Sequence, residues 1–314
     1  MFLYSLLFLH YMNNKHNNYL NNYINSVIEN RDKNKFPKKI NLIIDGGAFN
    51  CAYMGGCLSY IKQLENSNIT KVGKISGCSA GALLGMMYLT DTLHYLPIYY
   101  SILVEKVREN VQLDRLHKII KTHVKKEHVS KIDGRLFISY YNVTTLQHTV
   151  VSKFKSHYEI IDCLIKSSFV PILINGKLEY REHYCDGMLP YLFTNTKIPN
   201  LFISLFTLKD LKYVVYTKND VDIYNKLFDG INDIDNFFRY NKCRYCSFIQ
   251  DWSNKDFIYF RLRELISLFI IILIKYNKVF FSLIPKIIKE NNIINNILKI
   301  ILTLIKDILK YNIF

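Results

Sequence analysis

The pentapeptide Gly77-Cys78-Ser79-Ala80-Gly81 constrains this chain more than any other segment. It lies between a short strand-like run, 71–76, and a run of strong helix formers, 80–89. A G-x-S-x-G pattern between a strand and a helix predicts a sharp turn that presents the serine hydroxyl as a nucleophile. Gly77 and Gly81 are expected to be glycine because the strand and the helix approach each other closely there. We therefore expect Ser79 to be a nucleophile on an elbow.

The pattern around this elbow predicts an α/β fold. Strands are expected at 40–44, 71–76, 135–142, 148–154, 178–184 and 201–206, and helices at 53–64, 80–89, 93–129 and 160–166. Alternation of strands and helices is typical of a mainly parallel sheet with both faces covered. The basic stretch 118–131 is interpreted as the solvated face of a helix.

A serine hydroxyl needs a base to accept its proton, and the base can be a histidine or a carboxylate. In α/β-hydrolases the catalytic residues follow the order Ser, Asp or Glu, then His. His183 is the last histidine of the chain, and no histidine follows Asp186. That order is therefore disfavoured, and His183 is expected on a strand surface.

Four segments occur in the order found in one known family. They are Asp45-Gly46-Gly47-Ala48-Phe49-Asn50-Cys51, the elbow 77–81, Ser167-Ser168-Phe169-Val170-Pro171, and Asp186-Gly187-Met188. With them the chain resembles the patatin-like phospholipase family, over roughly residues 41–206. Several ordered motifs are more specific than any single one.

The resemblance implies a patatin-like three-layer fold and a serine–aspartate dyad. Ser79 would be the nucleophile and Asp186 its base. Backbone N–H groups of Gly46, Gly47, Ala48 and Phe49 would stabilise the oxyanion. The implied activity is hydrolysis of acyl esters in phospholipids or other glycerolipids, without a metal or an organic cofactor.

The glycine-rich loop departs from the family pattern at three positions. Ala48 replaces a glycine, Asn50 replaces the usual basic residue, and Cys51 replaces the glycine after it. These changes restrict the backbone and remove a charge that could anchor the loop. They leave open an alternative, a catalytically impaired member that binds lipid at a membrane, and a third possibility, a peripheral scaffold whose tail binds proteins.

The chain is expected to comprise a lead-in at 1–38, a hydrolase core at 39–207, a loop-rich extension at 208–256 and a helical, membrane-associating tail at 257–314. In the tail, 265–274 is almost entirely apolar but half the length of a membrane span, and 294–310 has the pattern of a basic amphipathic helix. Packing of this helix on the hydrolase core, or a transmembrane hairpin over 265–284, remains an alternative.

The composition narrows the expected partners and compartment. The formal net charge of +15 comes with many Ile, Asn and Tyr residues, a bias that codon usage can produce, so nucleic acid is not an expected partner. Seven scattered cysteines favour a reducing compartment, and the lone pair Cys243 and Cys246 lacks the further ligands of a zinc site. We expect a membrane-associated protein on the cytoplasmic side. The AT-rich bias is typical of parasites and large viruses, and for a virus the membrane would be the host cell's.

Overall fold

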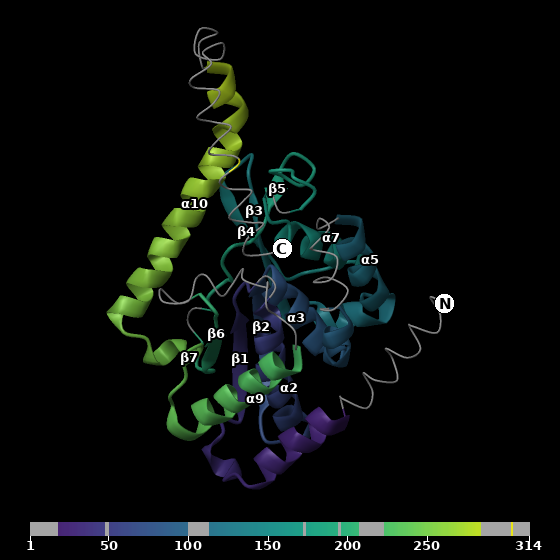
Figure 1. Ribbon diagram of the computed structural model, residues 1–314, viewed down its shortest axis with the longest axis vertical. Helices are drawn as coiled ribbons and strands as arrows, with labels where there is room; N and C mark the ends of the chain where they lie inside the picture. Colours follow the sequence, from purple (N-terminus) through teal and green to yellow (C-terminus); the bar gives the residue numbers. More distant parts are fainter. Residues whose placement is uncertain are drawn as a thin grey trace.

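The computed structural model describes residues 18–47, 50–99, 113–171, 174–193, 196–206, 223–283 and 303 (Figure 1). Its strands are β1 (Lys39–Ile44), β2 (Lys71–Cys78), β3 (Leu136–Asn142), β4 (Gln147–Val151), β5 (Tyr184–Cys185), β6 (Asn200–Ile203) and β7 (Cys246–Phe248). Its helices are α2 (Cys51–Asn66), α3 (Ala80–Leu89), α5 (Leu113–His123), α6 (Val129–Ile132), α7 (His157–Ser167), α9 (Ile223–Tyr240) and α10 (Asn254–Leu283). Short 3-10 turns lie at Lys33–Lys35, Leu93–Tyr95, Lys126–His128 and Ile249–Asp251.

The seven strands form one mixed sheet in the order β4-β3-β2-β1-β6-β7, with β5 paired to the end of β3. The four central strands β3, β2, β1 and β6 are parallel, and β4, β5 and β7 pair antiparallel. The predicted α/β class and mainly parallel sheet are therefore confirmed. The carboxyl ends of the four parallel strands meet at one edge of the sheet and their amino ends at the opposite edge.

Alternation along β1 determines which residues face each side of the sheet. Ile40, Leu42 and Ile44 belong to the main core, which includes buried residues of α2 and α3. Ile43 faces the other way and packs with Phe202 of β6 and with Phe260, a residue of α10. Since β1 is buried on both faces, its residues from Ile40 to Ile44 are apolar except for Asn41, which is buried and bonded to Asn200.

Helix α9 corrects the expectation of a loop-rich extension at 208–256. Its buried residues Leu227, Ile231, Ile234 and Phe237 follow helical spacing and pack in the main core. The Asn and Asp residues between them have low helix propensity, which hid this periodicity, but burial against α2 outweighs propensity. Strand β7, also within this extension, joins the sheet beside β6.

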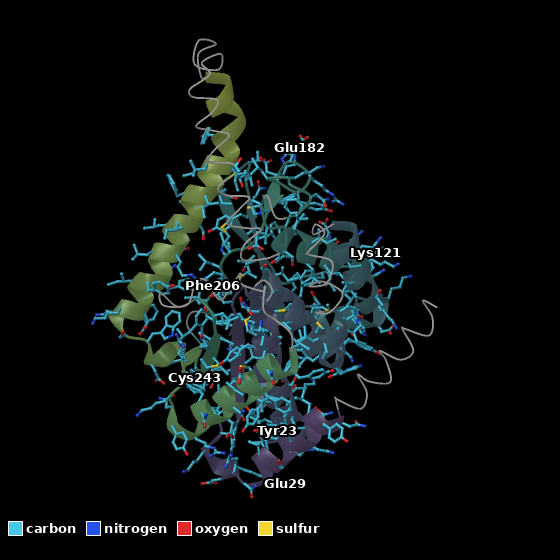
Figure 2. All side chains as sticks on the ribbon, in the orientation of Figure 1. Tyr23, Glu29, Lys121, Glu182, Phe206 and Cys243 are labelled. Carbon is cyan, nitrogen blue, oxygen red and sulfur yellow. The ribbon has the colours of Figure 1, made fainter. Side chains whose placement is uncertain are left out.

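The polar lead-in also contains a helix, over residues 18–29. Leu20, Ile24 and Ile28 lie one turn apart and are buried in the main core. Tyr23, labelled in Figure 2, donates a hydrogen bond to Asn232 of α9 at 2.6 Å. Three apolar residues at i, i+4 spacing are enough to dock this segment although its remaining residues are polar.

Two other predicted elements differ from the structure. The helix expected at 93–129 is broken, because Val124 and Lys125 are not helical and a 3-10 turn follows at Lys126–His128; residues 100–112 lie outside the described part. The strand expected at 178–184 is a turn, since Arg181 and Glu182 have φ angles of 48° and 63°. Left-handed backbone at two successive residues is incompatible with an extended strand.

The crossing of α2 and α9 generates a stability prediction. An added Cβ at Gly230 would lie 2.0 Å from the carbonyl oxygen of Tyr53, and one at Gly56 would lie 2.1 Å from that of Leu227. Backbone cannot yield as a side chain can, so Gly230→Ala is expected to lower the free energy of unfolding by about 1–3 kcal/mol despite the higher helix propensity of alanine. Urea unfolding would measure it, with Asp229→Ala on the exposed side of α9 as the control. Equal stability of the two variants would contradict the close crossing.

Candidate active site

Ser79 lies at the turn between β2 and α3, as the motif predicts. Its backbone has φ 51° and ψ −129°, a left-handed conformation that is unusual for a residue with a side chain. Such a conformation costs on the order of 1–3 kcal/mol and persists where the surrounding structure enforces it. Ser79 is also the N-cap of α3, and its side chain makes no capping hydrogen bond. The hydroxyl is therefore not engaged with the helix.

The two flanking glycines allow the elbow to form. An added Cβ at Gly77 would lie 2.6 Å from backbone atoms of Gly81 and Ala82. One at Gly81 would lie 2.4 Å from the carbonyl oxygens of Ile44 and Asp45, at the end of β1. The predicted requirement for glycine at both positions is confirmed, and its source is contact with β1 as well as with α3.

Asp186 reaches the elbow through β5. Cys185 pairs with Tyr141 near the end of β3, and β2 pairs with β3 as far as Cys78 opposite Ser139. Gly187 packs on the same place, because an added Cβ would lie 2.2 Å from the carbonyl oxygen of Ser139 and 2.9 Å from Cβ of Cys78. Asp186 and Gly187 thus come directly after β5 and lie beside the elbow that carries Ser79.

Ser167 holds the two halves of this arrangement together. Its hydroxyl donates to the Ser139 carbonyl at 2.7 Å and accepts from the Ser79 backbone N–H at 2.9 Å. The Ser167 carbonyl oxygen accepts from the Gly187 N–H at 3.2 Å. The carbonyl oxygen of Phe169, two residues later, accepts from the Asp186 N–H at 2.9 Å. In the sequence, segment 167–171 stood out only because it resembles a motif of the patatin-like family. In the structure it positions both Ser79 and Asp186.

The Asp186 carboxylate is buried and suited to accept a proton. Burial raises its pKa to about 6, although hydrogen bonding to the Ser79 hydroxyl and the Met188 backbone N–H opposes the increase. Oδ1 accepts from Met188 at 2.8 Å. Oδ2 is buried and, within the described residues, has no hydrogen-bond partner of normal geometry. The Ser79 hydroxyl is close enough to lower this pKa, and the buried Oδ2 remains available to accept a proton.

His183 lies away from this pair. Its ring is on the exposed surface, with Nδ1 2.8 Å from the hydroxyl of Thr144. Its expected location on the surface is confirmed, in a turn before β5 rather than within a long strand.

The glycine-rich loop provides fewer oxyanion donors than expected. The Gly46 N–H donates to the Asp45 carboxylate at 2.8 Å, so it is already engaged. Gly46 is nevertheless beside Ser79, since an added Cβ would lie 3.6 Å from Cβ of Ser79. The Gly47 N–H has no acceptor among the described residues. Ala48 and Phe49, the other two expected donors, lie outside the described part of the chain.

Helix α3 offers a donor that the sequence analysis did not include. Its first helical residue is Ala80; the Ala82 N–H donates to the Ser79 carbonyl at 3.0 Å, whereas the N–H groups of Ala80 and Gly81 have no acceptor among the described residues. These groups and the helix dipole favour negative charge at the elbow. These donors could have been predicted from the sequence, because the run of helix formers begins directly after Ser79.

Arg263 of α10 is a further residue of the site region that the sequence did not reveal. Its guanidinium donates to both carboxylate oxygens of Asp45, at 2.7 and 3.1 Å, and lies 4.5 Å from the ring centroid of Phe206. Figure 2 shows Phe206 beside α10. Asp45 is fully buried and also accepts from the Ser204 hydroxyl at 2.6 Å. No short-range pattern connects residues 45 and 263, so only the fold could show this contact.

A second cation contacts the same loop, at Asn50. Lys226 of α9 donates to the side-chain oxygen of Asn50. Arg263 and Lys226, from two helices far along the chain, thus bring two cations to the loop.

The remaining metal-binding and redox candidates show no assembled site. Cys243 and Cys246 are free thiols, as are the other five cysteines. Among the described residues, no group of three or more His, Cys, Asp or Glu side chains is arranged to hold a metal ion.

The chain was compared with known proteins. No family model matches it, and no curated protein matches it either.

The raised pKa of Asp186 predicts that its ionised carboxylate destabilises the fold. Below pH 3.8 the carboxyl is neutral in both folded and unfolded protein, and above about pH 6 it is charged in both. The stability associated with Asp186 is therefore lost as the pH rises through about 6. Asp186→Asn keeps an acceptor for Met188 and should be more stable than the wild type at pH 8, by on the order of 1–3 kcal/mol.

Urea unfolding of both proteins at pH 4 and pH 8 would measure this difference. The advantage of the asparagine variant should be small at pH 4. An equal difference at both values would mean that the charge on Asp186 is not its cause.

Proposed function

We propose that the protein is a lipid acyl hydrolase of the patatin-like type, with a three-layer patatin-like fold, that cleaves acyl esters of phospholipids or other glycerolipids. One observation carries the proposal: a serine at a strained elbow adjoins a buried carboxylate with a raised pKa, and the nearest histidine in sequence lies on the surface. Two neighbouring groups of this kind are typical of a nucleophile and its base.

The reaction would proceed through two acyl transfers. Asp186 accepts the proton of Ser79 as Oγ attacks the ester carbonyl carbon, and the oxyanion is stabilised by N–H groups of Gly47 and the first turn of α3. The tetrahedral intermediate collapses to an acyl-Ser79 ester, and the leaving alcohol takes the proton from Asp186. Water then attacks the acyl group and loses a proton to Asp186; as the second tetrahedral intermediate collapses, the carboxylic acid leaves and Ser79 Oγ takes this proton from Asp186. The chemistry needs no metal or organic cofactor.

Helix α10 supports a substrate at a membrane. One side of it is buried, through Phe260, Ser267, Ile271 and Ile274. Its other side exposes large apolar residues along most of its described length, namely Phe257, Ile258, Leu262, Leu265, Ile266, Phe269, Ile270, Leu273 and Tyr276. Exposed apolar patches of this extent mark interaction sites, and an enzyme acting on lipid has a use for one.

The part of the chain that the structure describes has no helix long and apolar enough to cross a membrane. Its exposed apolar side leads us to propose that α10 lies along the membrane surface. In Figure 1 it runs along one side of the sheet and continues beyond the sheet's end. The amphipathic pattern at 294–310 lies outside the described residues except for Thr303.

A specific observation favours the alternative, a catalytically impaired lipid-binding protein. The Gly46 N–H is bonded to Asp45 rather than facing the nucleophile. If the remaining donors are insufficient, the fold and the membrane face would persist without turnover. Reaction of Ser79 with a covalent probe separates the two functions.

The dyad is tested with a fluorophosphonate probe and a short-chain ester. The wild type should be labelled, Ser79→Ala should not, and Asp186→Asn should lose at least about a thousandfold in kcat/KM because asparagine accepts no proton. Wild-type kcat/KM should rise with pH through about 6, the pKa of Asp186.

His183→Ala serves as the control and should stay within about twofold of the wild type, since the ring is outside the site. Loss of activity in this variant with retention in Asp186→Asn would replace the dyad with a histidine base. An unlabelled wild type would favour the lipid-binding alternative.

The membrane face is tested by flotation with anionic phospholipid vesicles. Leu262→Gln, Phe269→Gln and Leu273→Gln together should reduce vesicle binding at least tenfold, because they remove three apolar side chains that would enter the interface. Hydrolysis of a soluble ester should not change. A matched control is Tyr19→Gln, Tyr158→Gln and Tyr240→Gln, which changes three similarly exposed rings on other elements. Equal loss in both variants would contradict a role for α10.

Point variants are preferable to removal of the tail from Phe257 onward. Such a truncation would also remove Phe260 and Arg263, leaving the buried Asp45 carboxylate without its counter-charge. Loss of one partner from a buried ion pair typically costs about 3–5 kcal/mol.

A further inference from the structure

The amino ends of the parallel strands carry a repeated chemical feature. Lys39 and Lys71 are the first residues of β1 and β2, Arg135 directly precedes β3, and Lys197 lies three residues before β6. Because parallel strands begin at the same edge of a sheet, four basic residues distant in sequence come together. This edge is opposite the one that carries Ser79 and Asp186.

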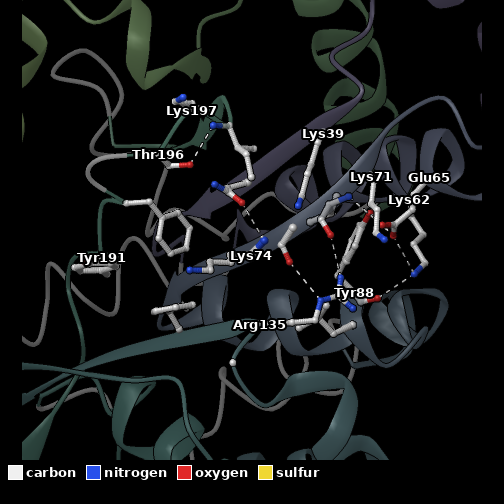
Figure 3. Close-up of a pocket in the computed structure, with 18 residues that line it drawn as sticks. Lys39, Lys62, Glu65, Lys71, Lys74, Tyr88, Arg135, Tyr191, Thr196 and Lys197 are labelled. Carbon is white, nitrogen blue, oxygen red and sulfur yellow. Dashed lines mark hydrogen bonds and ion pairs between the residues drawn. The ribbon is translucent and has the colours of Figure 1, made fainter.

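These residues line a cavity of about 1030 Å³. Lys62 of α2 and Lys74 of β2 also line it, and Figure 3 shows their side chains around the same opening as Lys39, Lys71 and Arg135. Phe137 and Tyr191 form part of its wall, with nearly parallel rings 6.0 Å apart. Neither Ser79 nor Asp186 lines it. The volume is at the upper end of the range usual for small-molecule sites.

The charges of this cavity are not balanced within the described residues. Its one carboxylate, Glu65, accepts hydrogen bonds from the Val72 N–H and the Tyr88 hydroxyl and pairs with Lys62 at 3.6 Å. Arg135 donates to the carbonyl oxygens of Val72 and Gly73.

Four further lysines of the cavity have no acidic partner in that part of the chain: Lys39, Lys71, Lys74 and Lys197. Several like charges around one concavity repel each other, and a bound anion relieves that repulsion.

We propose that this cavity binds the phosphate groups of a small, multiply phosphorylated molecule. Several ammonium groups on separate strands suit several phosphates, each of which offers strong acceptor oxygens. The basic residues surround a concavity of small-molecule size instead of following an extended groove, which favours a compact ligand over a nucleic acid. The phosphates can belong to a soluble metabolite or to a lipid headgroup. The proposal is independent of the hydrolase activity.

The test uses tripolyphosphate as the probe, with binding measured by calorimetry at 150 mM salt to screen weak surface attraction. The wild type should bind one equivalent. Lys39→Gln, Lys71→Gln and Lys74→Gln together should weaken binding at least tenfold. The control, Lys126→Gln, Lys155→Gln and Lys177→Gln, removes the same charge from exposed positions outside the cavity and should change binding less than twofold. Circular dichroism would verify that all variants are folded.

Two results would overturn the proposal: no saturable binding by the wild type, or equal weakening in the two triple variants, which would mean attraction to net charge alone. Lys71→Glu, a single reversal at an exposed position, should also weaken binding and provides a second variant. Flotation with phosphatidylcholine vesicles, with and without phosphatidylinositol bisphosphate, distinguishes the source. Vesicle binding that requires this lipid and is competed by tripolyphosphate indicates a headgroup, whereas saturable tripolyphosphate binding without lipid-dependent flotation indicates a soluble ligand.

Discussion

The buried carboxylate of Asp45 is the interaction on which the site region depends. Asp45 directly follows β1, and its carboxylate accepts hydrogen bonds from the Gly46 N–H and from the Ser204 hydroxyl after β6. Both of its oxygens also accept from the guanidinium of Arg263 in α10. A fully buried charge is tolerated only when it is paired and hydrogen-bonded, so these partners are interdependent. Docking of α10 therefore stabilises the loop beside Ser79.

Docking of α10 also connects the site to the surface of the molecule. The helix is apolar on both its buried and its exposed sides, and Arg263 is the point at which it contacts the glycine-rich loop. A helix that is apolar all round normally has a partner on each side. The sheet provides one partner, and a lipid surface is the proposed second one. Under this proposal, the same helix that orients the protein on its substrate stabilises the loop next to Ser79.

The two edges of the sheet have different chemistry for the same topological reason. Parallel strands gather their carboxyl ends at one edge, where sharp turns bring Ser79 and Asp186 together, and their amino ends at the other, where four basic residues meet. Neither group is contiguous in sequence. The proposed hydrolase site and the proposed phosphate site therefore both arise from strand order, and they lie too far apart along the strands to share a ligand.

The sequence by itself determined the elements with strong local signals. The apolar run of β1, the elbow glycines and helix α3 were predictable because steric limits at Gly77 and Gly81 and helix propensity act over a few residues. Helix α9 was missed because its apolar stripe is diluted by Asn and Asp. Only the tertiary structure showed that Ser167 bridges Ser79 to β3, that Arg263 and Lys226 contact the glycine-rich loop, and that Gly46 is engaged with Asp45. Such contacts join residues up to 218 positions apart, and they depend on strand order and helix docking, for which a local sequence pattern carries no information.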